Sequence, residues 1–399
     1  MKHVVYCHQY FNKPTDAGGT RSFYIANAMI EAGLSVTIVT SDRAPGGRST
    51  IRKETLNGID IYWIPAGYDN SMSKPRKLLA FFNYMAVSSY LVLRIKQYDL
   101  IYATSTPLTV GVPALVASWL RRKPYVFEVR DLWPEFPIQM GAIKSPPVIW
   151  IARKLESLIY ARAKAIVALS PGMREGVLKV KSDAVTHLVP NMSKPREFHN
   201  PVVNAKDREY FGLSEAKFRA VYFGTLGRAN NVVHLIEEAR YAKENGIDIE
   251  LVLVGGGAME PVAKAYVEDH GLDNVVFLGQ RPMAEVVKIV AICDVSLVSF
   301  TGEPVLQTNS PNKFFDSLSA SKPCVVNVNG WIRELIEEHD CGSYADPSIK
   351  GDLSRILQHY KVSPEIIERQ AANAYELCLA SFDRETLCQQ IVEIVQGVK

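Results

Sequence analysis

The chain has 399 residues, which is too long for one ordinary hydrophobic core, so we expect about two domains. Its 47% apolar and 22% charged residues are typical of a soluble globular protein. Residues 1–11 hold no apolar run long enough for a signal peptide. The six cysteines show no CxxC or metal-type spacing, which indicates reduced thiols in a cytoplasmic protein.

The formal net charge of +3 conceals an asymmetry between the two halves of the chain. Residues 1–200 contain 26 Lys+Arg and 14 Asp+Glu, a charge of +12, whereas the remainder contains 19 and 28, a charge of −9. A basic half predicts an anionic partner. No segment combines dense Lys and Arg with stacking aromatic residues, so we do not expect nucleic acid to be that partner.

The first half alternates short apolar runs with amphipathic segments. Strands are expected at 4–10, 36–41, 59–65, 100–105, 125–129 and 165–170, and helices at 20–32, 76–97, 108–121 and 147–163. After a polar segment at 191–207 the alternation restarts, with strands at 219–225, 249–255, 274–279, 295–300 and 324–328. Helices at about 364–379 and 383–397 end the chain.

Continuous apolar strands separated by helices are typical of parallel sheets covered on both faces. We therefore predict an α/β protein with two doubly wound domains, at 1–200 and 201–375. Residues 376–399 should form a helix that packs back toward the first domain. Such sheets bind ligands at the carboxyl ends of their strands, so we expect a cleft between the domains lined by those ends.

Two loops of the first half carry polar residues at strand ends. In the first, Gly18 and Gly19 would let the backbone approach a ligand beside the amides of the next helix, although a plain turn also fits. His8 ends the strand before this loop. The second loop, 128–135, holds a charged trio of Glu128, Arg130 and Asp131 that needs either internal pairing or a function.

The stretch 298–323 predicts an anion site in the second half. Ser310 suits an N-cap and Pro311 the first helical position, with the cation Lys313 in the first turn. A cation is unfavourable at that helix end unless an anion is bound there. Asp316 lies one turn further on, so the two could read a diphosphate and its ribose. A solvated Lys313–Asp316 pair fits the spacing equally well.

Other strand-end loops of the second half are less specific. The turn at 224–228 has two glycines and ends at Arg228, and Gln280 and Arg281 follow the strand at 274–279. The run 255–257 lacks the spacing of the GxGxxG fingerprint, which argues against a nicotinamide cofactor.

Taken in order, seven motifs resemble a retaining GT-B glycosyltransferase of family 4, of the kind that assembles bacterial O-antigen, capsule and related polysaccharides. They are HQYF…AGGTR, VRDLWPE, ALSPGM…VPN, the turn at 224–228, LVGGG, NVVFLG and SPNKFFDSLSASKP. The resemblance covers nearly the whole chain. It implies a nucleotide-sugar donor, expected to be UDP-linked and to carry an N-acetylated hexosamine or deoxyhexosamine, and no cofactor or metal.

The resemblance also implies roles for individual residues. Asp316 matches the second glutamate of the family's E-x7-E motif, but Thr308 stands where the first glutamate belongs, and Glu303 could replace it. The implied catalytic residues are Lys313, Arg228, Glu303 and Arg130. The implied donor-binding residues are Gly18, Gly19, Thr225, Gln280, Arg281, Thr308, Asn309, Ser310, Asn312 and Asp316. On the acceptor side stand His8, Arg21, Asp131 and Glu135.

We expect transfer with retention of configuration, in which the leaving phosphate takes the acceptor's proton. Two alternatives remain: a UDP-sugar 2-epimerase on the same architecture, and a catalytically silent sugar-nucleotide-binding subunit.

The apolar segment 78–93 is too short to span a bilayer, and two interpretations of it remain. It is either a helix lying on an anionic membrane at the inner face of the cell membrane, near a lipid-linked saccharide acceptor, or a helix buried under the first sheet. The rim residues expected on the membrane interpretation are Arg76, Lys77, Arg94, Lys96, Trp119, Arg121, Arg122 and Lys123.

Overall fold

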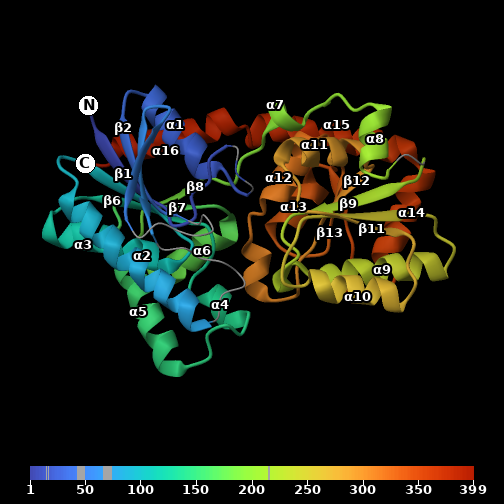
Figure 1. Ribbon diagram of the computed structural model, residues 1–399, viewed down its shortest axis with the longest axis horizontal. Coiled ribbons are helices and arrows are strands. Elements are labelled where there is room, and N and C mark those ends of the chain that lie inside the picture. The colour runs from blue at the N-terminus through green and yellow to red at the C-terminus, as the bar shows by residue number, and fades with distance from the viewer. Residues whose placement is uncertain (15, 17, 43–49, 66–73, 214–215) are drawn as a thin grey trace. The chain divides into compact units, whose positions relative to one another are not determined.

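The computed structural model describes residues 1–399 except 15, 17, 43–49, 66–73 and 214–215. The described chain divides into two compact units, one formed by Met1–Pro190 with Glu385–Lys399 and the other by Asn191–Arg384. Each contains a parallel sheet covered by helices (Figure 1). The prediction of two Rossmann-like α/β domains is confirmed.

The first unit is built on an eight-stranded sheet in the order β3-β4-β2-β1-β5-β6-β7-β8. Only β3 is antiparallel to its neighbour. The strands are β1 (His3–Cys7), β2 (Ser35–Ser41), β3 (Arg52–Leu56), β4 (Ile59–Ile64), β5 (Leu100–Thr104), β6 (Tyr125–Val129), β7 (Ala165–Ala168) and β8 (Thr186–Leu188). The continuous burial of β1, β5 and β6 explains why their sequences are apolar without alternation.

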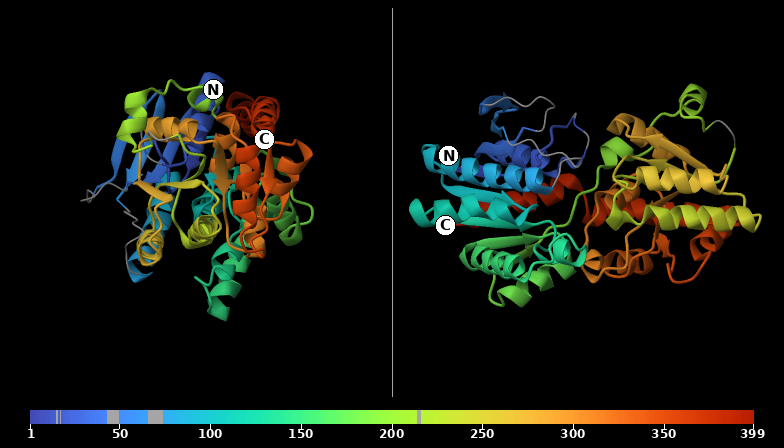
Figure 2. Two further views of the ribbon diagram at one scale, coloured as in Figure 1. Left: turned by 90° about the vertical axis from the view of Figure 1, so that its right-hand side faces the viewer. Right: turned by 60° about the horizontal axis from the view of Figure 1, so that its bottom comes forward.

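Helices α2, α3 and α5 pack beside one another on the first sheet, and their apolar faces form a core with β1, β5 and β6. Figures 1 and 2 show α1 and the final helix α16 at the opposite face. The helices of this unit are α1 (Arg21–Glu31), α2 (Lys74–Arg94), η1 (Leu108–Val110), α3 (Gly111–Leu120), α4 (Glu135–Gln139), α5 (Pro146–Arg162), α6 (Pro171–Val180) and α16 (Arg384–Gly397).

The second unit is built on a six-stranded parallel sheet in the order β11-β10-β9-β12-β13-β14. Helices α9, α10 and α14 share one core with it, and α7 and α11 share another. The strands are β9 (Arg219–Phe223), β10 (Glu250–Val254), β11 (Val275–Gly279), β12 (Val295–Val298), β13 (Cys324–Val326) and β14 (Gly342–Tyr344). The helices are α7 (Pro195–Phe198), α8 (Ala205–Tyr210), η2 (Arg228–Asn230), α9 (Val232–Glu244), α10 (Glu260–Asp269), α11 (Met283–Ile292), η3 (Pro304–Thr308), α12 (Asn312–Ser319), α13 (Trp331–Glu338), α14 (Asp352–Val362) and α15 (Pro364–Ser381).

The unit boundaries differ from the sequence-based ones. The chain crosses after Pro190 rather than near residue 200, because residues 191–194 are hydrogen-bonded to Ser310 and to α12 of the second unit. Residues 376–384 belong to the second unit, since α15 continues to Ser381. From Glu385 onward the chain belongs to the first unit, where the Lys2 amine donates to the Val395 and Val398 carbonyls at the end of α16.

Helix α2 shows both a buried and an exposed apolar face. Tyr84 and Val92 are fully buried in the core of the first unit, whereas Leu79, Phe82 and Tyr90 are exposed. The side chains of Arg76 and Lys77 lie outside the described residues. In the described part of the chain, no helix is both long and apolar enough to cross a membrane.

Arg121 does not have the role that the membrane interpretation gives it. Its guanidinium donates to the carbonyls of Val92 and Ile95, at 3.2 and 2.5 Å, and lies over the ring of Tyr98. These carbonyls belong to the end of α2, where the last turn leaves acceptors without helical partners. Arg121 is therefore a cap that fastens α2 to α3.

We predict that Arg121→Ala lowers the free energy of unfolding by about 2 kcal/mol, because charge-assisted hydrogen bonds to partly buried carbonyls are lost. Urea unfolding measures this as a lower midpoint at unchanged slope. Lys96→Ala, an exposed truncation near the same helix end, serves as the control. Equal effects of the two substitutions would show that Arg121 is not a cap.

Candidate functional site

Two glycine turns meet at the carboxyl ends of β9 and β10. Gly224 donates its N–H to the Val254 carbonyl at 2.8 Å, and Leu226 donates to Gly256 at 3.0 Å. A Cβ at Gly255 would lie 1.8 Å from the Gly224 oxygen, so no side chain fits there. Gly255 also has φ +136°, which favours glycine. The glycine run 255–257 does not have the nicotinamide fingerprint. Its lack of side chains instead allows it to lie in direct contact with the turn that follows β9.

The helix after β12 begins one residue later than predicted. Helix α12 starts at Asn312, and Pro311 rather than Ser310 takes the capping position, with no side-chain cap. The Ser310 side chain is used elsewhere: its Oγ accepts from the backbone N–H of Asn191 at 3.2 Å. The sequence misses this because residue 191 is distant along the chain.

Lys313 lies at the start of α12 and is buried, with 9% of its surface exposed. Its amine donates to the Tyr222 hydroxyl at 2.5 Å and sits 3.8 Å from the centroid of that ring. The described residues offer it no carboxylate for an ion pair. Burial lowers the pKa of Lys313 to about 7. An anion bound beside this buried amine would stabilise its charged form.

The Tyr222 hydroxyl links this amine to the glycine turn. It donates to the Thr225 carbonyl at 2.8 Å while accepting from Lys313. A Cβ at Gly224 would lie 3.3 Å from Lys313 Cε, so the turn and the lysine are in contact. Tyr222 was missed because it reads as one more apolar residue of a buried strand.

Asp316 does not pair with Lys313, so the predicted solvated pair is wrong. Its carboxylate oxygens lie 3.1 and 3.5 Å from the Lys194 amine, and both residues are largely buried. Burial raises the pKa of Asp316, and Lys194 opposes that rise. Lys194 also donates its backbone N–H to the Ser319 hydroxyl, so the start of the second unit is fastened along α12.

The loop between β12 and α12 contains polar atoms without partners among the described residues: Thr301 Oγ1 and Glu303 Oε2, both buried. Thr301 donates its N–H to the Ala229 carbonyl at 2.9 Å, which places this loop against η2 and Arg228. The Thr308 hydroxyl donates to Val305 at 2.7 Å. Glu303, rather than Thr308, therefore has an oxygen left for a ligand.

The remaining predicted donor-binding residues differ in their surroundings. Gln280 is exposed beside Gly256. The Arg281 guanidinium is engaged by the Leu278 carbonyl at 2.8 Å and by Glu285 at 3.2 Å, and it lies over Tyr210. Asn309 accepts from Trp331 Nε1 through its carbonyl, and Asn312 is the first residue of α12.

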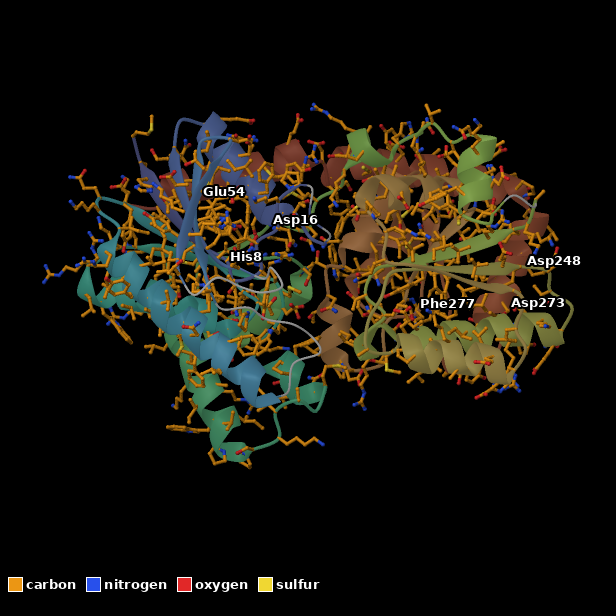
Figure 3. All side chains as sticks on the ribbon, in the orientation of Figure 1. His8, Asp16, Glu54, Asp248, Asp273 and Phe277 are labelled. Atoms are coloured by element: carbon orange, nitrogen blue, oxygen red, sulfur yellow. The ribbon has the colours of Figure 1, made fainter. Side chains whose placement is uncertain are left out.

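In the first unit, the loop after β1 is closed by hydrogen bonds. Asn12 donates to the Gly19 carbonyl at 3.1 Å, and Gly18 has φ +115° with no room for a Cβ beside Asn12. Lys13 pairs with Glu54 of β3 at 2.6 Å and donates its N–H to Asp16. His8, Asp16 and Glu54 lie in the same part of this unit (Figure 3).

Arg21 has a structural role. It is 4% exposed, and its three nitrogens contact the Glu128 carboxylate at 2.8 Å and the carbonyls of Val189 and Pro190. Each nitrogen of the guanidinium therefore donates at least once within the first unit. Glu128 thus pairs with Arg21 rather than with Arg130, and it also accepts from Thr104.

Three other predicted residues of this unit each have different hydrogen-bond partners. Asp131 accepts from the Thr106 hydroxyl at 3.3 Å, and burial, opposed by Arg130, raises its pKa to about 6. Glu135 lies in α4 and is engaged by Gln139 and Arg153. His8 Nδ1 lies 2.9 Å from the Ser22 hydroxyl.

The sequence analysis missed Gln9, which follows His8. Its carboxamide is fully buried, and neither Oε1 nor Nε2 has a partner among the described residues. A buried amide without partners is costly, so a bound polar group would satisfy it.

Comparisons with known proteins identify the family. Residues 17–192 match the family model for a glycosyl transferase 4-like domain, and residues 203–377 match that for glycosyl transferases group 1. The chain belongs to the group 1 glycosyltransferases of GT-B architecture.

Relatives and solved structures agree with this family. WbjE of Pseudomonas aeruginosa, named as a glycosyltransferase, is 24% identical over 287 residues, 71% of each chain. The alpha-D-kanosaminyltransferase of Streptomyces kanamyceticus is 22% identical over 196 residues, 49% of each chain. Among structures, sucrose-phosphate synthase of Thermosynechococcus elongatus aligns with TM-score 0.76 at 18% identity, covering 99% of this chain and 98% of the other. HepE of Anabaena, in complex with UDP, aligns over the whole of both chains with TM-score 0.69 at 20% identity.

We predict that Lys194→Met lowers the free energy of unfolding by about 3 kcal/mol, because it leaves the Asp316 carboxylate buried and unpaired. Asp316→Asn in the same chain should restore at least half of that loss. Because the raised pKa of Asp316 makes the folded state bind the extra proton, Lys194→Met should lose stability as the pH rises above the pKa of an exposed aspartate. Additive losses in this double-mutant cycle would show that the two groups do not interact.

Proposed function

We propose that this glycosyltransferase moves a sugar from a UDP-sugar to a hydroxyl group of a lipid-linked saccharide, with retention of configuration, in the biosynthesis of a cell-surface polysaccharide. The observation that carries the donor assignment is Lys313. It is a buried amine in the first turn of α12, in contact with the glycine turn that follows β9, and no carboxylate among the described residues pairs with it.

The chemistry follows from where charge develops. As the C1–oxygen bond to the donor's phosphate breaks, negative charge grows on the leaving diphosphate and the sugar becomes oxocarbenium-like. The Lys313 amine, the free N–H groups at the start of α12 and the Arg228 guanidinium would stabilise that charge. The acceptor oxygen forms its bond to C1 on the same face, and its proton passes to the departing phosphate oxygen.

UDP as the nucleotide is supported by similar proteins. HepE of Anabaena was solved with UDP and with UDP-glucose, and a trehalose-6-phosphate enzyme of E. coli with UDP-2-fluoro glucose. Asp316 lies one turn after Lys313 and would bind the ribose hydroxyls, exchanging part of its contact with Lys194. Glu303, whose buried Oε2 has no partner among the described residues, would take the place of the absent motif glutamate and bind a sugar hydroxyl.

The proposals for the acceptor and for its location are based on features of the first unit. Its net positive charge and the exposed apolar residues of α2 suit an anionic membrane surface at the inner face of the cell membrane, where a lipid-linked saccharide is reached. His8, Asp131 and the buried amide of Gln9 are the polar groups proposed to face that acceptor. The amide of Gln9 would suit an N-acetyl group, since its NH₂ can donate to the acetyl carbonyl and its own carbonyl can accept from the N–H.

Two other functions give different products. A 2-epimerase would convert the UDP-sugar alone into its epimer, and a silent binding subunit would bind donor without releasing UDP. A thermal-shift screen of nucleotide sugars identifies the donor, because a ligand that binds only the folded state raises the melting temperature. Incubation of that donor with and without saccharide-lipid acceptors then separates the three functions. Acceptor-dependent UDP release supports the transferase.

We predict that UDP binding at pH 8.5 takes up close to one proton. Free Lys313, with a pKa of about 7, is mostly neutral at that pH, and the diphosphate favours its charged form. Calorimetric titration in buffers of different ionisation enthalpy measures the uptake. Lys313→Arg, which stays charged, should bind UDP without proton uptake. An uptake of zero in the wild-type protein would mean that Lys313 does not meet the diphosphate.

We predict that Lys313→Ala lowers kcat by about 100-fold or more with a smaller change in KM, since its charge is needed most in the transition state. The rate of UDP release from the donor found in the screen measures this. A kcat/KM within about twofold of the wild type would remove Lys313 from the mechanism and leave Arg228 as the cation to test.

A further inference from the structure

Helix α5 of the first unit exposes apolar side chains on the face opposite the core. Trp150 is 62% exposed, Ile151 60% and Val148 47%, whereas Ile159 and Tyr160 on the other face are buried. A helix that covers a sheet normally presents charged residues to water on its outer face. Figures 1 and 2 show this helix extending away from the sheet of its unit.

Most of the charges around these residues are positive, and Glu135, which pairs with Arg153, is an acid beside them. Between residues 136 and 174 the chain has six cations and a single acid, Glu156. That acid is on the buried face, where burial raises its pKa to about 7, so it contributes little negative charge to the surface. The exposed charges of the segment are therefore cationic: Lys144, Arg153, Lys154, Arg162, Lys164 and Arg174.

A hollow of about 400 Å³ lies along the same helix. The Lys154 amine stands 5.9 Å from the ring centroid of Trp150 within it, and Arg153 lies beside both and is 3.4 Å from Glu135. An apolar wall with two cations suits a phosphate group joined to an acyl chain. The hollow is lined by Pro146, Ile149, Trp150, Arg153, Lys154 and Ser157.

We propose that α5 is the element that docks this protein on a membrane, inserting Trp150 and Ile151 into the surface of an anionic bilayer with a lipid phosphate at Arg153 and Lys154. Apolar and aromatic residues surrounded by cations, on a helix of 17 residues, suit a helix that binds at a lipid surface. The sequence places the membrane site of the proposed function on residues 78–93, and the present proposal moves that site to α5. It rests on the proposed function only because a lipid-linked acceptor gives the protein a reason to bind a membrane.

The α2 surface is the competing membrane site. Leu79 and Phe82 are exposed there, but Arg121, one of the cations expected beside them, is used to cap the helix end. The α5 surface has both its apolar residues and its cations on one element. A comparison of matched substitutions on the two helices therefore decides between them.

The test is flotation of the full chain with vesicles of phosphatidylcholine alone or with about 30% phosphatidylglycerol at low salt. The wild-type protein should float only with the anionic vesicles. Trp150→Ala with Ile151→Ser should lower the bound fraction at least tenfold. Val262→Ser with Leu379→Ser, which removes two exposed apolar residues of α10 and α15, should leave it unchanged.

Several results would overturn the proposal. They are wild-type binding that ignores lipid charge, an α5 variant that floats like the wild type, and loss of flotation in Leu79→Ser with Phe82→Ser while the α5 variant still binds. UDP binding without vesicles is measured for every variant, and the α5 variant should retain it. If the wild-type protein does not bind UDP, that result would count against the proposed donor site and not against the membrane site.

A conservative variant covers the case in which the double substitution unfolds the unit. Brominated lipid should quench part of the tryptophan fluorescence of the wild-type protein on anionic vesicles, and Trp150→Phe should lose that part. Lys154→Glu should weaken flotation about tenfold, whereas Lys179→Glu on α6, the same charge change at another exposed site, should not. Quenching that is equal in Trp150→Phe and the wild type would refute insertion of this helix.

Discussion

The second unit is arranged around the burial of one amine. Removing a charged amine from water is costly unless a partner is supplied, and among the residues that the structure describes the polar partner of Lys313 is the hydroxyl of Tyr222. That hydroxyl is itself held by the Thr225 carbonyl, and the turn it belongs to can approach because residues 224 and 255 are glycines. The strand ends, the turns and the start of α12 thus converge on a position that an anion would complete.

Two buried ion pairs fasten the chain where it leaves the first unit and enters the second. In the first unit Arg21 joins Glu128 to the carbonyls of Val189 and Pro190. In the second, Asn191 and Lys194 are bound to the loop and helix that carry Ser310 and Asp316. The charges of each pair lose contact with water when they are buried, and several fixed hydrogen bonds within the protein replace that contact. These hydrogen bonds offset the cost of burying the charges and specify one conformation.

The two units differ in their net charge and in where their cations lie. In the acidic second unit the buried amine of Lys313 lies at the proposed diphosphate position, so the attraction of an anion there would be local. The basic first unit spreads its cations over exposed helices, where each is worth little alone and several together attract an anionic surface. Under the two proposals, the same residue type would act at the donor site in one unit and at the membrane surface in the other, according to its burial and neighbours.

The sequence by itself determined the elements and the architecture. The apolar strands at 36–41, 100–105 and 295–300 are fully or largely buried between helices, and such runs have no alternative to a parallel sheet. It also placed Gly18 and the 224–228 turn in loops that follow strands, and Lys313 in the first turn of a helix, since loop composition and helix-start signals are local. It did not show the strands β3, β8 and β14, which are short or polar and depend on their neighbours.

Only the tertiary structure decided which charges meet. Lys313 has Asp316 three residues away but contacts Tyr222, 91 residues distant, and Asp316 contacts Lys194, 122 residues distant. Arg21 and Glu128 are joined across 107 residues, and Arg121 caps a helix that ends 27 positions earlier. Hydrogen bonds depend on separations of a few ångströms, and these are set by how strands and helices pack, which no local pattern of residues records.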